Sequence, residues 1–239
     1  MEKKIIAIFG GSFNPPINSH VFLAKQIIEK LENIEKIIFV PVSTKYNKKG
    51  LLEDKHRYNM LKIICDKEQD LEVSNIEMNS KKQLYTIETL NYFKEQYNNN
   101  EIYFIMGTDN LKELETWKTP EKILKSYKII VLERENDNLE EIINNNNFFK
   151  NNKNSIIKIN GIERINLSST MIREKIKKGE SIEKFIDKDV LKYIEKNELY
   201  IVWLNKYLIW QLYYILCINL KRRKRRNIIK KIVCDYNTI

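Results

Sequence analysis

The chain carries Gly10-Gly11-Ser12-Phe13-Asn14-Pro15-Pro16-Ile17-Asn18-Ser19-His20 directly after an apolar run at residues 5–9. This order predicts a buried first strand, a glycine turn and a helix over about residues 19–31. Glycines let the backbone approach an anion closely, and a helix N-terminus presents unpaired N–H groups at the positive end of its dipole. His20 can add a donor from the first turn of that helix. The junction therefore predicts a nucleotide site, although it lacks the lysine of a Walker loop and the third glycine of a dinucleotide fingerprint.

A second polar motif, Leu167-Ser168-Ser169-Thr170-Met171-Ile172-Arg173, lies much further along the chain. Ser168 or Ser169 can cap a helix over about residues 170–178. Hydroxyls, N–H groups and the fork of Arg173 would then be free for polyphosphate oxygens. Taken alone, this motif is better explained as an ordinary Ser-Thr cap with an arginine on a solvated face.

Short apolar runs alternate along the chain with amphipathic helical patterns. This alternation predicts an α/β fold with a doubly wound parallel sheet. The expected strands cover residues 5–9, 37–40, 102–106, 129–132 and 156–159, and the expected helices cover residues 19–31, 54–66, 86–97, 120–126 and 170–178. Ligands of such sheets bind at the carboxyl ends of the strands, beside the switch point of the strand order. The candidates that follow strands at this edge are His20, residues 41–49, residues 107–109 and Arg134.

Two further segments lie outside this alternation. Residues 136–154 are polar and rich in asparagine, which predicts a loose surface excursion. Residues 187–200 carry Val190, Ile194 and Leu199 near helical spacing, which predicts a closing helix.

The formal net charge of +10 is concentrated at the C-terminus. Residues 201–239 hold nine Lys or Arg against one Asp, which leaves +2 for residues 1–200. We therefore expect a domain over residues 1–200 that binds no nucleic acid, followed by an atypical hydrophobic and basic helical extension over residues 201–239.

The cysteines and the N-terminus bear on the compartment. Cys65, Cys217 and Cys234 are an odd number without metal-ligand spacing, which fits a reducing cytoplasm and predicts neither a disulfide framework nor a protein metal site. The charged start of the chain, followed by five apolar residues, is too short for a signal peptide. Both observations predict a cytoplasmic protein.

Together, the two polar motifs resemble the signatures of the nucleotidyltransferase superfamily, usually written G-[GS]-[ST]-F-[DN]-P-x-[HT]-x-G-H and [IL]-S-S-T-x-[IV]-R. Both motifs occur here in the order that the superfamily has. Residues 11–15 and His20 match the first signature. Ile17 stands at the position of its His or Thr, and Ser19 stands at the position of the Gly that precedes its final His. The resemblance implies a Rossmann-like nucleotidyltransferase fold.

Residues 4–200 are similar in length and motifs to the bacterial nicotinate mononucleotide adenylyltransferases. The matching segments are Val40-Pro41, Lys48, His56-Arg57-Tyr58-Asn59-Met60-Leu61, Tyr85-Thr86-Ile87-Glu88-Thr89-Leu90, Met106-Gly107-Thr108-Asp109-Asn110-Leu111 and Thr116-Trp117. Asn47 stands where that family usually has a histidine before the lysine. Apart from the resemblance, Lys48 and Arg57 could equally be solvated charges, and Trp117 a core aromatic.

At the phosphates, the resemblance implies two catalytic residues, His20 and Arg173. His20 would contact the α- and β-phosphates of ATP, and Arg173 would hold outgoing pyrophosphate or the incoming phosphate. The other residues that the resemblance assigns to ATP phosphates are Gly11, Ser12, Lys48, Ser169 and Thr170.

At the two nucleosides, the resemblance implies separate subsites. Gly107 and Asp109 would hold the adenosine of ATP, with the Asp109 carboxylate accepting from sugar hydroxyls. Backbone groups at Tyr85 and Thr86 would bind the nicotinate, and Trp117 would cover the pyridine ring. An indole face suits an electron-poor ring, and a helix N-terminus suits a carboxylate.

The implied reaction transfers AMP from ATP to nicotinate mononucleotide and gives deamido-NAD and pyrophosphate, a step of NAD biosynthesis. Mg²⁺ would be carried on the ATP phosphates, since no carboxylate cluster offers a protein cage. Ile17 cannot donate to phosphate, and losing one such donor costs about 3 kcal/mol of barrier unless Asn18, Ser19 or the backbone compensates.

Two alternatives of function remain open from the sequence. The first is a sister adenylyltransferase that accepts nicotinamide mononucleotide or phosphopantetheine, although the phosphopantetheine family is shorter and lacks the Tyr85 and Trp117 motifs. The second is a degenerate nucleotide-binding or scaffold protein, which Ile17 and the C-terminal extension motivate. The sequence predicts no oligomeric state.

The extension itself has several interpretations. Sixteen of the twenty residues from 201 to 220 are apolar, and residues 221–226 are all basic. The length admits a membrane span, but a cytoplasmic basic flank would place the catalytic domain outside, away from its ATP. Three interpretations remain: an interfacial helix on anionic lipid, a nucleic-acid or partner contact, and a nonfunctional extension from a shifted reading frame. We favour the nonfunctional extension, because it holds four of the eight arginines and two of the three tryptophans.

Overall fold

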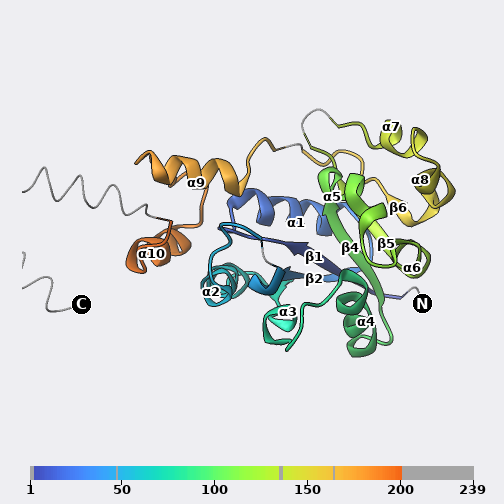
Figure 1. The fold of residues 1–239 in the computed structure, drawn as a ribbon, viewed down its shortest axis with the longest axis horizontal. Coiled ribbons are helices and arrows are strands. Elements are labelled where there is room, and N and C mark those ends of the chain that lie inside the picture. Colours follow the sequence, from blue (N-terminus) through green and yellow to red (C-terminus); the bar gives the residue numbers. More distant parts are fainter. Residues whose placement is uncertain (1–2, 47, 135–136, 164, 201–239) are drawn as a thin grey trace, which may run out of the picture. The chain divides into compact units, whose positions relative to one another are not determined.

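The computed structural model describes residues 3–46, 48–134, 137–163 and 165–200 (Figure 1). Its sheet has six strands in the order β3-β2-β1-β4-β5-β6, and every neighbouring pair is parallel. The strands are β1 (Ile5–Gly11), β2 (Ile34–Pro41), β3 (Leu71–Val73), β4 (Glu101–Gly107), β5 (Lys128–Leu132) and β6 (Ile156–Ile157). The predicted doubly wound parallel sheet is confirmed, with its switch point between β1 and β4. The sequence missed β3, which is three residues long.

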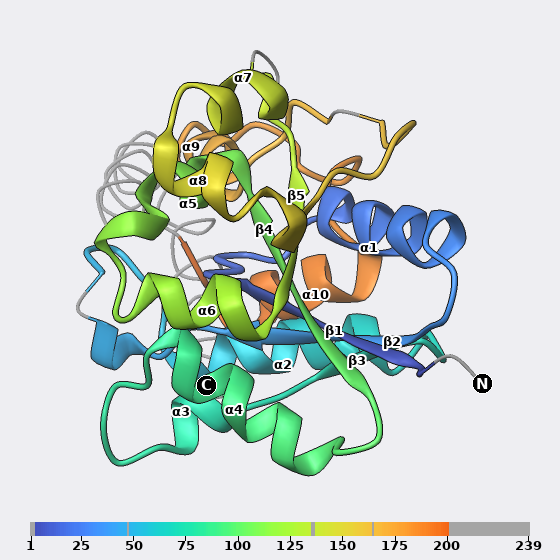
Figure 2. The same ribbon diagram turned by 90° about the vertical axis from the view of Figure 1, so that its right-hand side faces the viewer.

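The predicted helices are also present, each within two residues of its expected bounds. The helices are α1 (Asn18–Lys30), α2 (Asp54–Cys65), α3 (Ile76–Asn79), α4 (Thr86–Gln96), α5 (Thr108–Glu113), α6 (Pro120–Ser126), α7 (Leu139–Asn144), α8 (Asn147–Asn151), α9 (Ser169–Lys177) and α10 (Lys188–Lys196). Single 3₁₀ turns span Thr44–Tyr46, Leu114–Thr116 and Lys153–Ser155. Figure 2 shows α1 on one side of the sheet and α4 and α6 on the other.

The apolar core is divided by the sheet into two layers. Along β1, Ile6 and Ile8 belong to the layer under α4 and α6, whereas Ala7 and Phe9 belong to the layer under α1 and α2. Successive side chains of a strand point to opposite faces, so a strand that is covered on both faces needs a continuous apolar run. This requirement explains why the run at residues 5–9 precedes the glycine turn.

The prediction of a loose excursion over residues 136–154 is wrong for the part that the structure describes. Two short helices, α7 and α8, form there, and Leu139 and Phe149 are buried in the core. The Asn138 side chain accepts from the Glu140 backbone N–H, and the Asn146 side chain accepts from the N–H of Phe148. Asparagine is a preferred helix N-cap, so the asparagine-rich composition concealed two helix starts.

The predicted closing helix is α10, whose N-terminus is capped by Asp187. Lys67 of the segment after α2 forms ion pairs with both Asp187 and Asp189, at 2.7 Å each. Contacts between Cα atoms divide the chain into two units, Met1–Asn197 and Glu198–Ile239. The predicted helical extension over residues 201–239 lies outside the described residues. Among the helices that are described, none is long and apolar enough to cross a membrane.

Candidate active site

A cavity of about 530 Å³ opens at the carboxyl ends of β1, β4 and β5. It is lined by eleven of the twelve residues that the sequence assigned to the site, namely Gly11, Ser12, His20, Lys48, Thr86, Gly107, Asp109, Trp117, Ser169, Thr170 and Arg173. The twelfth, Tyr85, lines an adjoining hollow of about 150 Å³ that shares Thr86 and Trp117 with the main cavity. The fold therefore brings residues from both polar motifs and from the middle of the chain to one place.

His20 lies in the first turn of α1 and faces this cavity as a neutral donor. The Ile17 backbone N–H donates to His20 Nδ1 at 3.1 Å, which leaves the ring proton on Nε2. The Phe9 and Phe13 rings pack edge-on against the imidazole. Removal from water, and then the positive charge of Arg134, lowers the pKa of His20 to about 4. A phosphate placed beside the ring would favour the imidazolium form instead.

Ile17 replaces the usual polar residue of the signature, and it is packed in the interior of the protein instead of facing the cavity. Its side chain is 1% exposed, and it does not line the cavity. Of the residues expected to compensate, Ser19 lines the cavity, whereas Asn18 donates through its backbone and side chain to the carbonyls of Phe185 and Lys184. The compensation expected from Asn18 therefore has no structural support.

The N-terminus of α9 is docked on the turn that follows β1. Arg173 Nη1 donates to the Asn14 carbonyl at 2.7 Å, and Arg173 Nη2 donates to Thr170 Oγ1 at 3.1 Å. Ser169 Oγ donates to the Pro15 carbonyl at 2.7 Å. Ser168 caps the helix by accepting from the Met171 N–H. The expectation that these hydroxyls and the whole arginine fork are free is wrong, since Ser169 and one edge of the fork hold the two motifs together.

Lys48 and Arg57 bind the same turn from the other side. Lys48 Nζ donates to Ser12 Oγ at 3.0 Å, so its charge lies over the turn that follows β1. Arg57 is fully buried, and it donates to the carbonyls of Ser12 and Leu52 at 3.0 and 2.8 Å and to Asp54 Oδ1 at 2.5 Å. Arg57 is therefore not a solvated charge. The available signal was its spacing, because residue 57 lies on the same helical stripe as the buried residues 60, 61 and 64.

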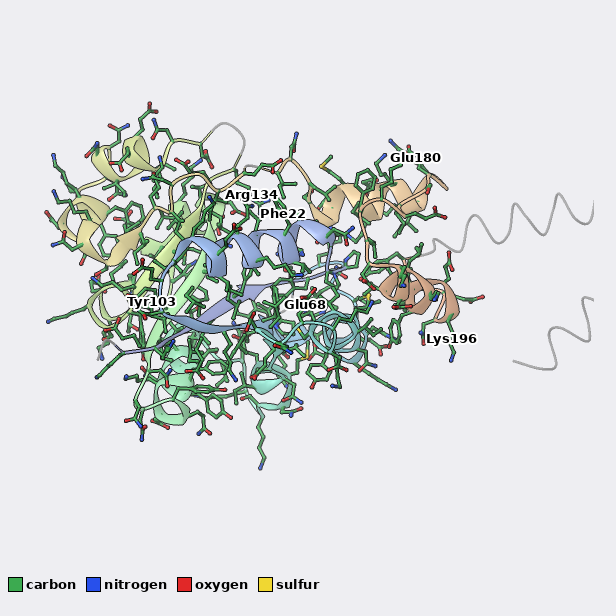
Figure 3. The ribbon with its side chains drawn as sticks, turned by 180° about the vertical axis from the view of Figure 1, so that it is seen from behind. Phe22, Glu68, Tyr103, Arg134, Glu180 and Lys196 are labelled. Atoms are coloured by element: carbon green, nitrogen blue, oxygen red, sulfur yellow. The ribbon has the colours of Figure 1, made fainter. Side chains whose placement is uncertain are left out.

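At the end of β4, the backbone at Gly107 lies close to the Asp109 side chain. A Cβ at residue 107 would lie 2.3 Å from Asp109 Oδ1, so a larger residue there would displace the Asp109 carboxylate from this position. Arg134, which is labelled in Figure 3 and follows β5, donates to both carboxylate oxygens of Asp109 at 3.3 and 3.4 Å. Its backbone N–H donates to Thr108 Oγ1. Arg134 was recognised in the sequence only by its place after a strand.

Another part of the cavity wall is formed by α4 and Trp117. The Tyr85 backbone N–H donates to Glu88 Oε2 at 2.9 Å, so that group is occupied by the helix's own cap. The Glu88 and Thr89 N–H groups donate to the Tyr85 carbonyl, which leaves the N–H groups of Thr86 and Ile87 without a partner in the helix. Trp117 packs edge-on against Phe104 with ring centroids 6.4 Å apart and lines both hollows. An anionic group at the start of α4 would thus lie beside an indole ring.

The arrangement can bind a polyphosphate between His20, Lys48 and Arg173 and two ring systems on either side of it. Within the described residues, no group of three or more His, Cys, Asp or Glu side chains is placed to hold a metal ion. Cationic and neutral donors without a nucleophile suit transfer of a phosphoryl-type group by positioning and charge stabilisation.

Comparison with known proteins agrees with this geometry. The cytidylyltransferase-like family model matches residues 8–175. A Clostridium tetani protein named "Probable nicotinate-nucleotide adenylyltransferase" is 35% identical over 84% of this chain and 100% of its own length. A Fusobacterium nucleatum protein of the same name is 39% identical over 80% of this chain and 97% of its own length.

A solved structure gives the same result. The Plasmodium falciparum nicotinic acid mononucleotide adenylyltransferase complexed with NaAD superposes with a TM-score of 0.67 and 26% sequence identity, covering 82% of this chain and 97% of that one. The chain belongs to the cytidylyltransferase-like family and, within it, to the nicotinate-nucleotide adenylyltransferases.

Proposed function

We propose that the protein transfers AMP from ATP to nicotinate mononucleotide, giving deamido-NAD and pyrophosphate in NAD biosynthesis. The observation that carries this function is the single cavity in which both phosphate motifs meet Thr86 and Trp117. The match to relatives that are named for this activity covers almost the whole length of those relatives. A 5′-phosphate oxygen of the mononucleotide attacks the α-phosphorus of ATP, the bond from that phosphorus to the bridging oxygen breaks, and pyrophosphate leaves with its electron pair.

The residues at the phosphates act by positioning and by neutralising charge. His20 donates from Nε2 to the α- and β-phosphate oxygens, beside the backbone N–H groups of Gly11 and Ser12. Lys48 and Arg173 carry the positive charge that stabilises outgoing pyrophosphate. The substrate is MgATP, in which the ion is carried by the phosphates. Because the reaction consumes ATP, we infer that the protein works in the cytoplasm.

A pyrophosphate-release assay tests the function directly. The purified full chain is supplied with ATP and, in separate reactions, nicotinate mononucleotide, nicotinamide mononucleotide or phosphopantetheine. We expect release with the nicotinate form, and a lower kcat/KM with the amide. ATP binding without release from any acceptor would instead support the degenerate scaffold that Ile17 suggested.

Trp117→Ala is expected to weaken binding of nicotinate mononucleotide by about 1–3 kcal/mol, because the pyridine ring loses the indole face. The effect on ATP should be much smaller, because we assign its adenosine to Gly107 and Asp109 and not to Trp117. Isothermal titration calorimetry with each ligand separately measures both affinities. Trp117→Phe, which keeps an aromatic ring, is the matched control, and equal losses for the two ligands would contradict the stacking role.

A chain that ends at Tyr200 is expected to fold, remain in solution and keep full adenylyltransferase activity. The residues that line the cavity all precede residue 174, and α10 with its Lys67 ion pairs is retained. Circular dichroism and the pyrophosphate assay compare this chain with the full chain. Unfolding or lost activity on truncation would show that residues 201–239 belong to the working protein.

A further inference from the structure

Glu77 of α3 is a buried carboxyl group that the proposed reaction does not use. It is 8% exposed and lines the main cavity. Thr89 Oγ1 of α4 donates to Glu77 Oε1 at 2.9 Å, and the Ser43 backbone N–H donates to the same carboxylate. A carboxylate at this position would repel the anionic substrates that the cavity is proposed to bind.

The position of Glu77 relates it to the nicotinate end of the cavity. Thr89 lies three residues after Thr86, so the two residues share one face of α4. A helix rises about 1.5 Å per residue, so Thr89, which is hydrogen-bonded to Glu77, lies within one turn of the first N–H groups of α4. Those N–H groups are where a nicotinate carboxylate would bind.

The groups that face Glu77 set its charge. Burial raises the pKa of Glu77 to about 7, and the negative charge of Asp54 acts in the same direction. The hydrogen bonds from Thr89 and Ser43 and the charge of Arg57 lower the pKa. On the 3₁₀ turn, Glu77 helps to raise the pKa of the Tyr46 phenol. The Lys45 ammonium on that turn donates to the carbonyl of Met78. Glu77 is therefore neutral below about pH 7 and anionic above it.

We propose that Glu77 is a specificity residue of the nicotinate end, whose neutral carboxyl admits the substrate's carboxylate and whose ionised carboxylate disfavours it. The inference rests on the proposed function and adds a pH dependence to its substrate choice. Both mononucleotides carry the same pyridinium ring, but the carboxamide of the amide substrate has no charge, so ionisation of Glu77 lacks the carboxylate repulsion there and affects the amide substrate much less. Binding of the acid substrate near pH 7 should correspondingly be coupled to uptake of a proton by Glu77.

The test measures the ratio of kcat/KM for nicotinate mononucleotide to that for nicotinamide mononucleotide between pH 6 and pH 8.5. Both substrates carry the same 5′-phosphate and use the same ATP, so titration of those groups and of His20 cancels in the ratio. For the wild-type full chain we expect the ratio to fall roughly tenfold across pH 7, as the ionised Glu77 carboxylate begins to repel the carboxylate of the substrate. Glu77→Gln should give a ratio that is constant over this range.

Two further variants locate the effect. Glu113→Gln removes an exposed carboxylate from the same cavity and should keep the wild-type fall, because water screens an exposed charge. Thr89→Val removes a hydrogen bond that favours the ionised carboxylate, so the fall should move to higher pH. Calorimetry of the wild-type protein at pH 7 in two buffers of different ionisation enthalpy should show more proton uptake with the acid substrate than with the amide.

The outcomes separate the inference from the function on which it rests. A fall in the ratio that persists unchanged in Glu77→Gln and Thr89→Val would overturn the inference alone. Should Glu77→Gln not fold, the shift in Thr89→Val and the wild-type proton uptake decide the question. Absence of pyrophosphate release with either mononucleotide would overturn the proposed function, and the inference with it.

Discussion

His20→Ala is expected to lower kcat/KM by about two orders of magnitude or more while the protein stays folded. The Ile17 N–H fixes the imidazole through Nδ1, so Nε2–H is a preorganised donor to the phosphates. Alanine removes that donor at the point where charge develops in the transition state. Pyrophosphate release at varied ATP measures the loss, and circular dichroism verifies the fold.

The chain offers a matched control for this substitution, because it has only two histidines. His56 forms a hydrogen bond with the Tyr193 hydroxyl through Nδ1 at 3.0 Å and does not line the cavity. His56→Ala should therefore leave kcat/KM close to the wild-type value. Normal turnover by His20→Ala would refute the assignment of the phosphate site.

Arg173→Ala should reduce kcat/KM by a similar factor of roughly one hundred or more, because a positive charge at the pyrophosphate is lost. Arg173 also donates to the Asn14 carbonyl, so part of the loss would come from weaker docking of α9. Arg173→Lys keeps the charge but not the fork, and it should recover only part of the activity.

The fold was largely predictable from the sequence, because burial on both faces of a parallel sheet requires long apolar runs. The run at residues 5–9 and its glycine turn predicted β1 and the N-terminus of α1 almost to the residue. The segment at residues 136–154 was not predictable by composition, because asparagine caps and a few apolar side chains carry its helices. The two helices in this segment, α7 and α8, are too short for a helical period of apolar residues to be recognised in the sequence.

The candidate site was predictable where backbone geometry and a motif coincide, as at Gly11, His20 and Gly107. It was not predictable where a residue acts through contacts between distant segments. Arg57 binds the Ser12 carbonyl across 45 positions, and Glu77 enters the cavity wall from a four-residue helix. The helical spacing of Arg57 indicates that it is buried but not which group it contacts, and Glu77 belongs to no such pattern. Tertiary structure was therefore needed to recognise both contacts.

Arg57→Met is expected to lower the free energy of unfolding by about 3–5 kcal/mol, the largest effect on stability that we predict. The methionine fills similar space, but Asp54 loses a charged partner and the carbonyls of Ser12 and Leu52 lose their donors. Urea denaturation of the full chain, followed by circular dichroism, measures the difference.

The control for Arg57→Met lies on the same helix. Lys62 pairs with Asp66 at 2.8 Å one turn further on, and both side chains are more than half exposed. Exposed pairs of this kind are solvated and screened, so Lys62→Met should change stability far less. A similar small change in the free energy of unfolding of both variants would mean that the Arg57 guanidinium does not hold the turn at Ser12 in place. A large loss in Arg57→Met alone would show that the loop at Ser12, which must receive ATP phosphates, is held in place by a buried charge on α2.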